Sequence, residues 1–211
     1  MEKINKFKTV IRYIRDFSIV VAGIAVTLYV NDKVTNKSEK RNLTLYLHSV
    51  KLEMETNIKQ IDGFVEALKP SVGYAKYLSA HDKKSLNKDS INSYNSISTS
   101  LQLFTYQANA FEMFKNSGIM RLMDNKDLLL TLWDVYHNLL FMKEISDWYF
   151  QTKWDDLKKE LPLLLEDEDE KIIPMYTFYV TGTPIAIMNT CEKVLQKAND
   201  LVLTLEKELN E

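Results

Sequence analysis

Apolar residues recur every three or four positions between Leu43 and Leu68, and polar residues fill the places between them. Residues at this spacing share one face of an α-helix, so the segment is predicted to form a long amphipathic helix. Its apolar face comprises Leu43, Leu47, Val50, Met54, Ile58, Ile61, Val65 and Leu68. Lys69-Pro70 is expected to end the helix, because proline removes a backbone donor and clashes with the preceding turn.

Similar spacing predicts further helices over 71–80, 105–117, 126–161 and 183–211. Gly118 is expected to stop the second of these in the left-handed conformation that glycine tolerates. Either Asp124 or Asn125 can cap the third, and Pro162 is expected to end it. Thr183-Pro184 resembles a helix cap followed by a first-turn proline, which opens the last helix.

Three segments separate these helices. Residues 81–100 are rich in serine and asparagine and are predicted to form a polar loop. The acidic loop 166–171 is expected to be solvated rather than to bind a cation, because it has no glycine or asparagine to let it curl round an ion. Residues 172–180 can form a short extended element or a packed loop. Together these features predict an all-α, antiparallel helical bundle over residues 32–211.

One run without charge, Phe17 to Val30, lies upstream of the bundle. As a helix it spans about 21 Å, against about 30 Å for the hydrocarbon core of a bilayer. Arg12 and Arg15 can extend this span, because their long side chains reach the head groups while their stems stay in the apolar zone. Residues 1–31 are therefore predicted to form a basic flank and a transmembrane signal-anchor that runs into the amphipathic helix.

The predicted anchor residues are Arg12, Tyr13, Arg15, Phe17, Val20, Val21, Ile24, Leu28, Tyr29 and Val30. Tyr13 and Tyr29 stand at the two ends of the span, where interfacial aromatic residues are expected. Two alternatives remain open. Gly23-Ile-Ala25 fits a signal-peptide cleavage site, although a cut there would divide the apolar run. The run can also form a core or interfacial helix.

Basic residues flank the apolar run on both sides. Lys3, Lys6, Lys8, Arg12 and Arg15 precede it, and Lys33, Lys37, Lys40 and Arg41 follow it. Positively charged flanks tend to stay in the cytoplasm. The slight excess before the run predicts a single-pass protein with its N-terminus in the cytoplasm and its C-terminal domain outside, in the periplasm.

Composition agrees with a helical protein. Hydrophobic residues make up 45% of the 211 residues and charged residues 27%, as in ordinary globular domains. The five glycines and four prolines are few, which disfavours β-sandwiches, barrels and phosphate-binding loops. The net charge of −2 provides no basic footprint, so no nucleic-acid partner is expected.

No motif in the chain predicts catalysis, a cofactor or a metal site. His48, His81 and His137 lie in three different segments, and none belongs to a close ligand pair. His137 follows Asp134 by three residues, so the two can pair on a helix surface. Cys191 has apolar neighbours at helical spacing and is expected to be a buried structural cysteine rather than a reactive thiol. We therefore assign no catalytic, cofactor-binding or metal-ligating residue.

Aromatic residues are dense within one helix length, residues 133–154, and most are expected to fill a core. Trp148, Tyr149 and Phe150 are consecutive, so they cannot all face one direction on a helix. At least one of them must pack against another layer, a partner or the membrane surface. Together with Trp154 they form the predicted interaction surface.

Two stretches of the chain resemble a known family. The first joins the apolar run to Asn31-Asp32, Glu39-Lys-Arg-Asn-Leu and the pattern Tyr46-Leu-x-x-x-Lys-Leu-Glu-Met-Glu-x-Asn57-Ile. The second contains Ala110-Phe-Glu-Met-Phe-Lys-Asn-Ser-Gly118-Ile-Met-Arg-Leu-Met and Leu132-Trp-Asp-Val-Tyr136. Together they resemble an uncharacterised family of single-pass membrane proteins common in Bacteroidota. This resemblance implies an N-terminal anchor followed by a helical domain, and it brings no established activity and no catalytic residue.

These features favour a non-catalytic, membrane-anchored scaffold or accessory subunit that contacts the lipid bilayer and a protein partner or a second copy. The alternative is a ligand-sensing bundle that signals through a partner, with a small-molecule ligand that is unknown. A third possibility is an enzyme whose site forms only in three dimensions. A buried cluster of His48 or His137 with carboxylates would indicate the enzyme, an apolar cavity with converging polar groups the sensor, and an exposed apolar stripe the scaffold.

Overall fold

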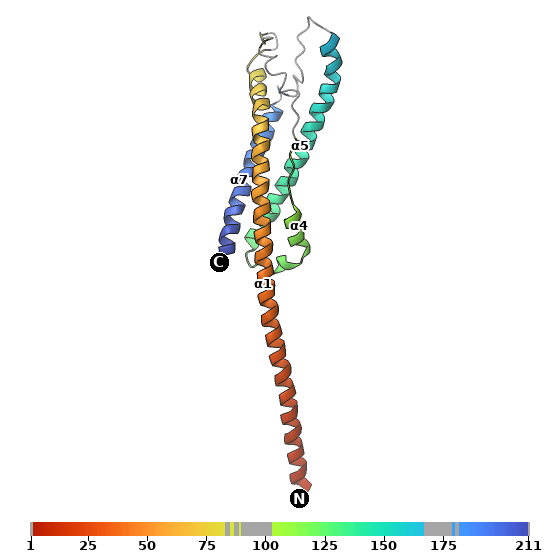
Figure 1. Cartoon of the computed structure of the whole chain (residues 1–211), viewed down its shortest axis with the longest axis vertical. Helices are drawn as coiled ribbons and strands as arrows, with labels where there is room; N and C mark the ends of the chain where they lie inside the picture. The colour runs from red at the N-terminus through yellow and green to blue at the C-terminus, as the bar shows by residue number, and fades with distance from the viewer. Residues whose placement is uncertain are drawn as a thin grey trace.

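The computed structural model of the chain is built from helices (Figure 1). These are α1 (Glu2–Ser79), α4 (Asn109–Asn116), the short 3-10 helix η2 (Ile119–Leu122), α5 (Lys126–Glu166) and α7 (Thr183–Asn210). The structure describes residues 2–82, 85, 86, 89, 103–166, 179 and 182–210, and it describes side chains at these positions except 2–16 and 156–166. Every regular element within these residues is helical, which confirms the predicted all-α class. Most of the polar loop 81–100, acidic residues 167–171 and residues 172–180 except Tyr179 lie outside them.

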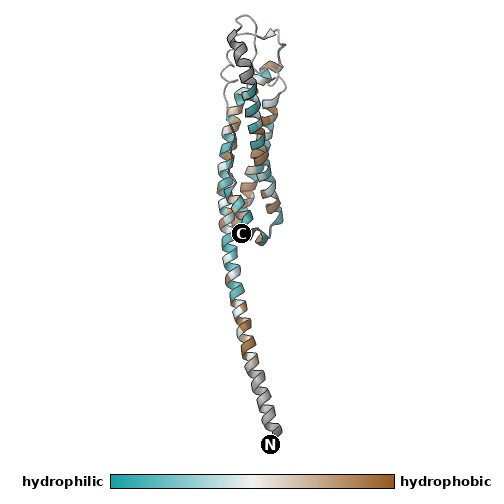
Figure 2. Cartoon of the chain, turned by 90° about the vertical axis from the view of Figure 1, so that its right-hand side faces the viewer, coloured by the Kyte–Doolittle hydropathy of each residue, from teal (hydrophilic) through white to brown (hydrophobic). Residues whose placement is uncertain are grey.

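Helix α1 is a single rod of 78 residues, about 117 Å long at 1.5 Å per residue. It begins in the predicted anchor and continues without interruption into the amphipathic segment, as the lack of a helix breaker between them predicts. The N-terminal part projects beyond every other element and carries an apolar band (Figure 2). The C-terminal part forms one wall of the bundle.

Helix α1 does not end at Lys69-Pro70, as its sequence predicts, but passes through Pro70 and includes the predicted helix 71–80. Leu68, Ser71 and Tyr74, on both sides of the proline, are buried against the rest of the bundle. Tertiary packing of this kind offsets the lost backbone hydrogen bond, and a local sequence signal does not report it.

Local sequence signals predict some of the other helix boundaries correctly and miss others. Gly118 adopts the left-handed conformation, with φ of 73°, as predicted. Asn125 caps α5, because its Oδ1 accepts the Leu128 N–H at 3.0 Å. Helix α5 continues through Pro162, however, so the predicted end there is wrong. Helix α4 begins at Asn109, later than predicted, because Asn57 of α1 and Ser146 of α5 bond to the backbone of the non-helical residues before it.

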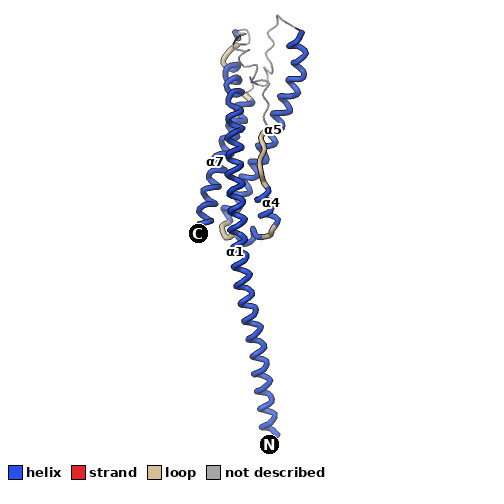
Figure 3. The backbone as a smooth tube through the Cα atoms, viewed as in Figure 1, coloured by secondary structure: helices blue, strands red, loops and turns tan. Residues whose placement is uncertain are grey.

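The bundle is formed by α1, by residues 103–116 including α4, by α5 and by α7, and consecutive segments run in opposite directions (Figure 3). Helices α1 and α5 run in one direction, and α7 runs in the opposite direction and packs against both. Helix α4 and the non-helical residues 103–108 lie in the remaining position, between α1 and α5. We name residues 103–108 the strap. The core draws on all of these segments and includes Val50, Met54, Ile61, Phe104, Phe114, Leu132, Leu139, Cys191, Val194, Leu201 and Leu205.

Candidate functional site

The predicted anchor lies on the projecting part of α1, where no described part of the chain covers it. Its described side chains are all exposed, namely Phe17, Val20, Val21, Ile24, Leu28, Tyr29 and Val30. Arg12, Tyr13 and Arg15 belong to the same helix, but their side chains lie outside the described positions. By length and composition, α1 is the one described helix that can cross a membrane, and none of its apolar window of 18 residues is buried.

The predicted interaction surface divides between the outside of α5 and the core. Trp148 is 54% exposed and Trp154 is 39% exposed, whereas Phe150 is half-buried. Tyr149 is only 3% exposed, so its assignment to this surface is wrong. Each residue turns the helix by about 100°, which sends consecutive side chains in different directions. Tyr149 points inward, where its hydroxyl lies 3.4 Å from Oγ of Ser71 on α1.

Large apolar side chains form an exposed stripe along α5, which we name the α5 face. It comprises Leu130, Trp133, Leu140, Phe141 and Trp148, each between 41% and 67% exposed. At about 100° and 1.5 Å per residue, the stripe is about 100° wide and about 27 Å long. Leu132, Leu139 and Met142 fill the core from the opposite side of the same helix. An apolar stripe of this size on the outside of a bundle is typical of a contact surface.

A buried carboxylate joins three helices beneath the α5 face. Glu53 of α1 is 7% exposed, and it accepts the backbone N–H groups of Ala110 at 2.7 Å and Phe111 at 3.2 Å. These groups lie in the first turn of α4, where a negative charge also meets the positive end of the helix dipole. Tyr136 of α5 donates its hydroxyl to the same carboxylate at 2.7 Å. Glu53 therefore fixes α4 and α5 relative to α1.

A chain of aromatic contacts links Tyr136, the partner of Glu53, to the exposed Trp133. The rings of Phe111 and Tyr136 stack at 4.1 Å, and Phe111 meets Trp133 of the α5 face edge-on at 5.3 Å. Burial, and then the hydrogen bond to Glu53, raise the pKa of Tyr136 above its ordinary value. The Tyr136 hydroxyl therefore stays protonated and remains a donor at physiological pH.

Polar side chains of α1 and α5 hold the strap. The Gln107 N–H donates to Asn57 Oδ1 at 2.7 Å, and Asn57 Nδ2 donates to the Gln107 carbonyl at 2.8 Å. On the other side, the Phe104 N–H donates to Ser146 Oγ of α5 at 2.7 Å. These bonds satisfy backbone groups that would otherwise need a helix or sheet, which explains why α4 starts only after the strap.

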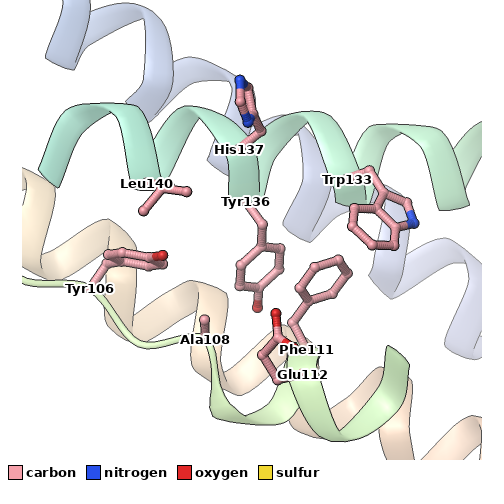
Figure 4. Close-up of a pocket in the computed structure, with 8 residues that line it drawn as sticks. All are labelled: Tyr106, Ala108, Phe111, Glu112, Trp133, Tyr136, His137 and Leu140. Carbon is pink, nitrogen blue, oxygen red and sulfur yellow. The ribbon is translucent and has the colours of Figure 1, made fainter. Parts of the chain in front are cut away.

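A hollow of about 150 Å³ opens where the strap meets the α5 face (Figure 4). Its lining residues are Tyr106, Ala108, Phe111, Glu112, Trp133, Tyr136, His137 and Leu140. Trp133 and Leu140 also belong to the α5 face, so the hollow is an indentation at the edge of that face. At its rim, Lys115 bonds to Glu112 and places its Nζ 5.5 Å from the centre of the Trp133 ring.

Acidic groups outnumber basic groups along the outside of α5. Between residues 126 and 155 the acidic residues are Asp127, Asp134, Glu144, Asp147 and Asp155. Lys143 pairs with Asp147, and Lys126 donates to the Met123 carbonyl. Glu144 is exposed within the arc of the α5 face and forms no ion pair with any residue that the structure describes. The α5 face therefore includes an exposed carboxylate among its apolar side chains.

A separate polar cluster lies in the core further along α5. Lys153 is 1% exposed, and its Nζ lies 5.7 Å from the centre of the Tyr149 ring. Burial lowers the pKa of Lys153 to about 8 and raises the pKa of Tyr149. Nearby, the rings of Tyr74 and Tyr179 stack at a tilt, 4.8 Å apart. This cluster is interior, so it does not contribute to a contact surface.

The other candidate reactive residues do not come together. Cys191 is buried as predicted, and burial raises the pKa of its thiol to about 12. His48 and His137 are both exposed, in separate helices. Asp134 forms an ion pair with Lys197 of α7 at 2.7 Å, and this bond lowers the pKa of Asp134. No group of three or more His, Cys, Asp or Glu residues among the described positions could hold a metal ion.

The roles of Glu53, Asn57 and Ser146, which bind the backbone of α4 and the strap, were not predicted from the sequence. A signal for the first two was present, because Val50, Glu53, Asn57 and Ile61 continue the spacing of three and four along the buried face of α1. A polar residue at such a position must find a buried partner. The partners themselves lie 50 or more positions away along the chain, so the spacing does not name them.

Comparisons of the chain with protein-family models, with curated proteins and with solved structures find no match. The resemblance to the Bacteroidota family stays a prediction. The geometry of the anchor, the strap and the α5 face therefore carries the functional conclusion.

Proposed function

We propose that this protein is a non-catalytic docking protein, in which α1 anchors a helical bundle to a membrane and the α5 face binds a protein partner. The observation that supports this most directly is that no described residue covers the apolar surfaces of the anchor and the α5 face, which belong to one connected helical frame. Removing apolar surface from water lowers the free energy by about 25 cal/mol per Å² buried. Each surface therefore favours a covering partner.

The two surfaces need different partners. If α1 crosses the bilayer at its apolar run, the bundle stands above the membrane and α5 runs alongside α1 (Figure 1). The hollow lies level with Glu53, because Tyr136 bonds to it, and this places the hollow about 35 Å beyond Val30 along the rod. A bilayer that covers the anchor cannot reach this height. A protein is the partner that fits the α5 face.

The excess of basic residues before the apolar run supports an orientation with the N-terminus in the cytoplasm and the bundle in the periplasm. For the ligand-sensing alternative, the described residues offer a depression of about 560 Å³ beside Tyr46 and α4, which is wide open to solvent, and the hollow. At about 150 Å³ the hollow is smaller than most ligand pockets, which hold about 300 to 1,000 Å³. The hollow suits a single side chain of a docked protein better than a free ligand.

Membrane fractionation tests the anchor. The full chain is expected to sediment with membranes, whereas a chain without residues 1–31 is expected to stay soluble. External protease applied to spheroplasts is expected to cleave the bundle if it is periplasmic. A full chain that stays in the soluble fraction at its unprocessed mass would contradict the anchor.

Site-specific photocrosslinking in cells tests the contact. A crosslinker at Trp148 on the α5 face is expected to give a discrete adduct with a membrane or periplasmic protein. The matched control is a crosslinker at Gln196, which is exposed on α7. The adduct is expected to disappear when Phe141→Ser is added to the crosslinker variant. Equal labelling from both positions would contradict docking at the α5 face.

A further inference from the structure

We propose that the α5 face binds an amphipathic helix of another protein, and that this helix carries basic side chains along the borders of its apolar stripe. The inference rests on the proposed docking function and names the chemistry of the partner. Its support comes from the shape, the charge and the orientation of the α5 face.

The α5 face has the shape of one side of a helix–helix contact. Trp133 and Leu140 are seven residues apart, and so are Phe141 and Trp148. A spacing of seven keeps side chains close to one line along a helix, and a second helix packs well along such a line. The hollow beside Trp133 and Leu140 provides room for one large anchor side chain. An extended peptide would instead need the free backbone groups of a sheet edge.

Acidic side chains give this surface its charge preference. Glu144 and Asp155 lie within the arc of the α5 face, and Asp127 flanks its start. The two lysines outside the core on this part of α5, Lys126 and Lys143, already bond within the chain. The α5 face therefore presents negative potential, which complements a basic helix.

The chain also shows how an ammonium group fits here. Lys115 places its Nζ over the Trp133 ring while it bonds to Glu112. A cation in this position is attracted by the negative face of the indole ring. Trp148 and Glu144 repeat the combination of indole and carboxylate one helical turn apart. A lysine or arginine of the partner can bind there in the same way.

A second copy of the chain and the bilayer both fit this surface less well. Two copies anchored in one membrane stand parallel, so a two-fold axis along the α5 face would bring each Glu144 close to its symmetry mate. Like charges in that arrangement repel. The bilayer is excluded by direction, because a membrane-spanning α1 holds the α5 face upright rather than flat on the membrane (Figure 1).

The test uses the full chain in nanodiscs of neutral phosphatidylcholine and two fluorescent helical peptides of three heptads each, with leucine at positions a and d. One peptide has lysine at positions e and g, and the other has glutamate there. Fluorescence anisotropy measures binding, with empty nanodiscs as the blank. The lysine peptide is expected to bind at least about tenfold more tightly at low salt, and high salt is expected to reduce this difference.

Matched charge reversals locate the effect. Glu144→Lys with Asp155→Lys on α5 is expected to abolish or reverse the preference for the lysine peptide. Glu192→Lys with Asp200→Lys makes the same charge change on exposed positions of α7 and is expected to preserve the preference. Equal binding of the two peptides to the native chain overturns the inference, and so does an equal response to the two reversals.

Apolar substitutions separate this inference from the proposed function. Phe141→Ser with Trp148→Ser is expected to weaken binding of the lysine peptide at least about tenfold. If these substitutions weaken both peptides equally and no charge preference exists, docking at the α5 face survives and only the basic partner is overturned. If they change the binding of neither peptide, both proposals fall. Dimerisation of the native chain that Phe141→Ser abolishes overturns the inference in favour of a second copy.

Discussion

The hydroxyl of Tyr136 on α5 donates a hydrogen bond of 2.7 Å to the carboxylate of Glu53 on α1. The same carboxylate accepts the first free backbone N–H groups of α4, including that of Ala110. Tyr136 also stacks on Phe111, which contacts Trp133 of the α5 face. One buried acidic residue therefore determines where the exposed tryptophan and the hollow beside it lie.

Removal of this bond is expected to destabilise the bundle. Tyr136→Phe and Glu53→Gln are each expected to lower the free energy of unfolding by about 2 kcal/mol, since hydrogen bonds to charged groups contribute about 1.5 to 3 kcal/mol. The double variant is expected to cost less than the sum of the two. Denaturant unfolding can be followed by tryptophan fluorescence, because all three tryptophans belong to α5. Strictly additive costs, or an equal loss in the exposed control Glu66→Gln, would contradict the role of Glu53.

The strap is expected to loosen when its side-chain partners are removed. Asn57→Ala takes away both bonds to Gln107, so the Gln107 amide is expected to exchange its hydrogen faster by a factor of about ten or more. Ser146→Ala is the matched control, because it removes the partner of the Phe104 amide and leaves Gln107 bonded. Hydrogen exchange read by mass spectrometry or NMR separates the two amides. Unchanged exchange at Gln107 in Asn57→Ala would show that packing alone holds the strap.

The buried Lys153 predicts a dependence of stability on pH. Its pKa is about 8 in the folded chain against an ordinary value of 10.5, so the unfolded chain holds more protons at this residue between those values. The free energy of unfolding therefore rises with pH in this window. Below about pH 8 the folded chain must bury the charged form of Lys153, and this lowers its stability most. The free energy of unfolding of the native chain minus that of Lys153→Met is expected to rise by about 1 kcal/mol from about pH 7 to about pH 9. A flat difference would contradict the lowered pKa.

Cys191 is expected to be unreactive in the folded protein. Burial raises its thiol pKa to about 12, so almost no thiolate is present at neutral pH, and the core blocks access. Modification by a disulfide reagent is expected to be at least about a hundredfold slower than in denaturant. A surface control is Ser49→Cys combined with Cys191→Ala, because Ser49 is exposed on α1. Equal rates at the two positions would contradict burial of Cys191.

Local periodicity was enough to predict much of the fold. The apolar face of α1, the left-handed Gly118 and a cap of α5 at Asp124 or Asn125 all depend on residues within a few positions of each other. Helical geometry relates such residues directly, so the order of amino acids determines them. The uncharged run from Phe17 to Val30 is similarly a local property, and it predicts an apolar helix without any tertiary information.

Contacts between distant residues decided the rest. Packing on both sides carries α1 through Pro70, and α5 is apolar on two sides, so its sequence does not tell which aromatic residues face outward. Only the folded chain shows that Tyr149 points inward while Trp148 is exposed. The sequence by itself determined that the protein is helical and where each helix is apolar. Tertiary structure decided which of those apolar surfaces are covered, because burial depends on neighbours that the fold brings from far along the chain.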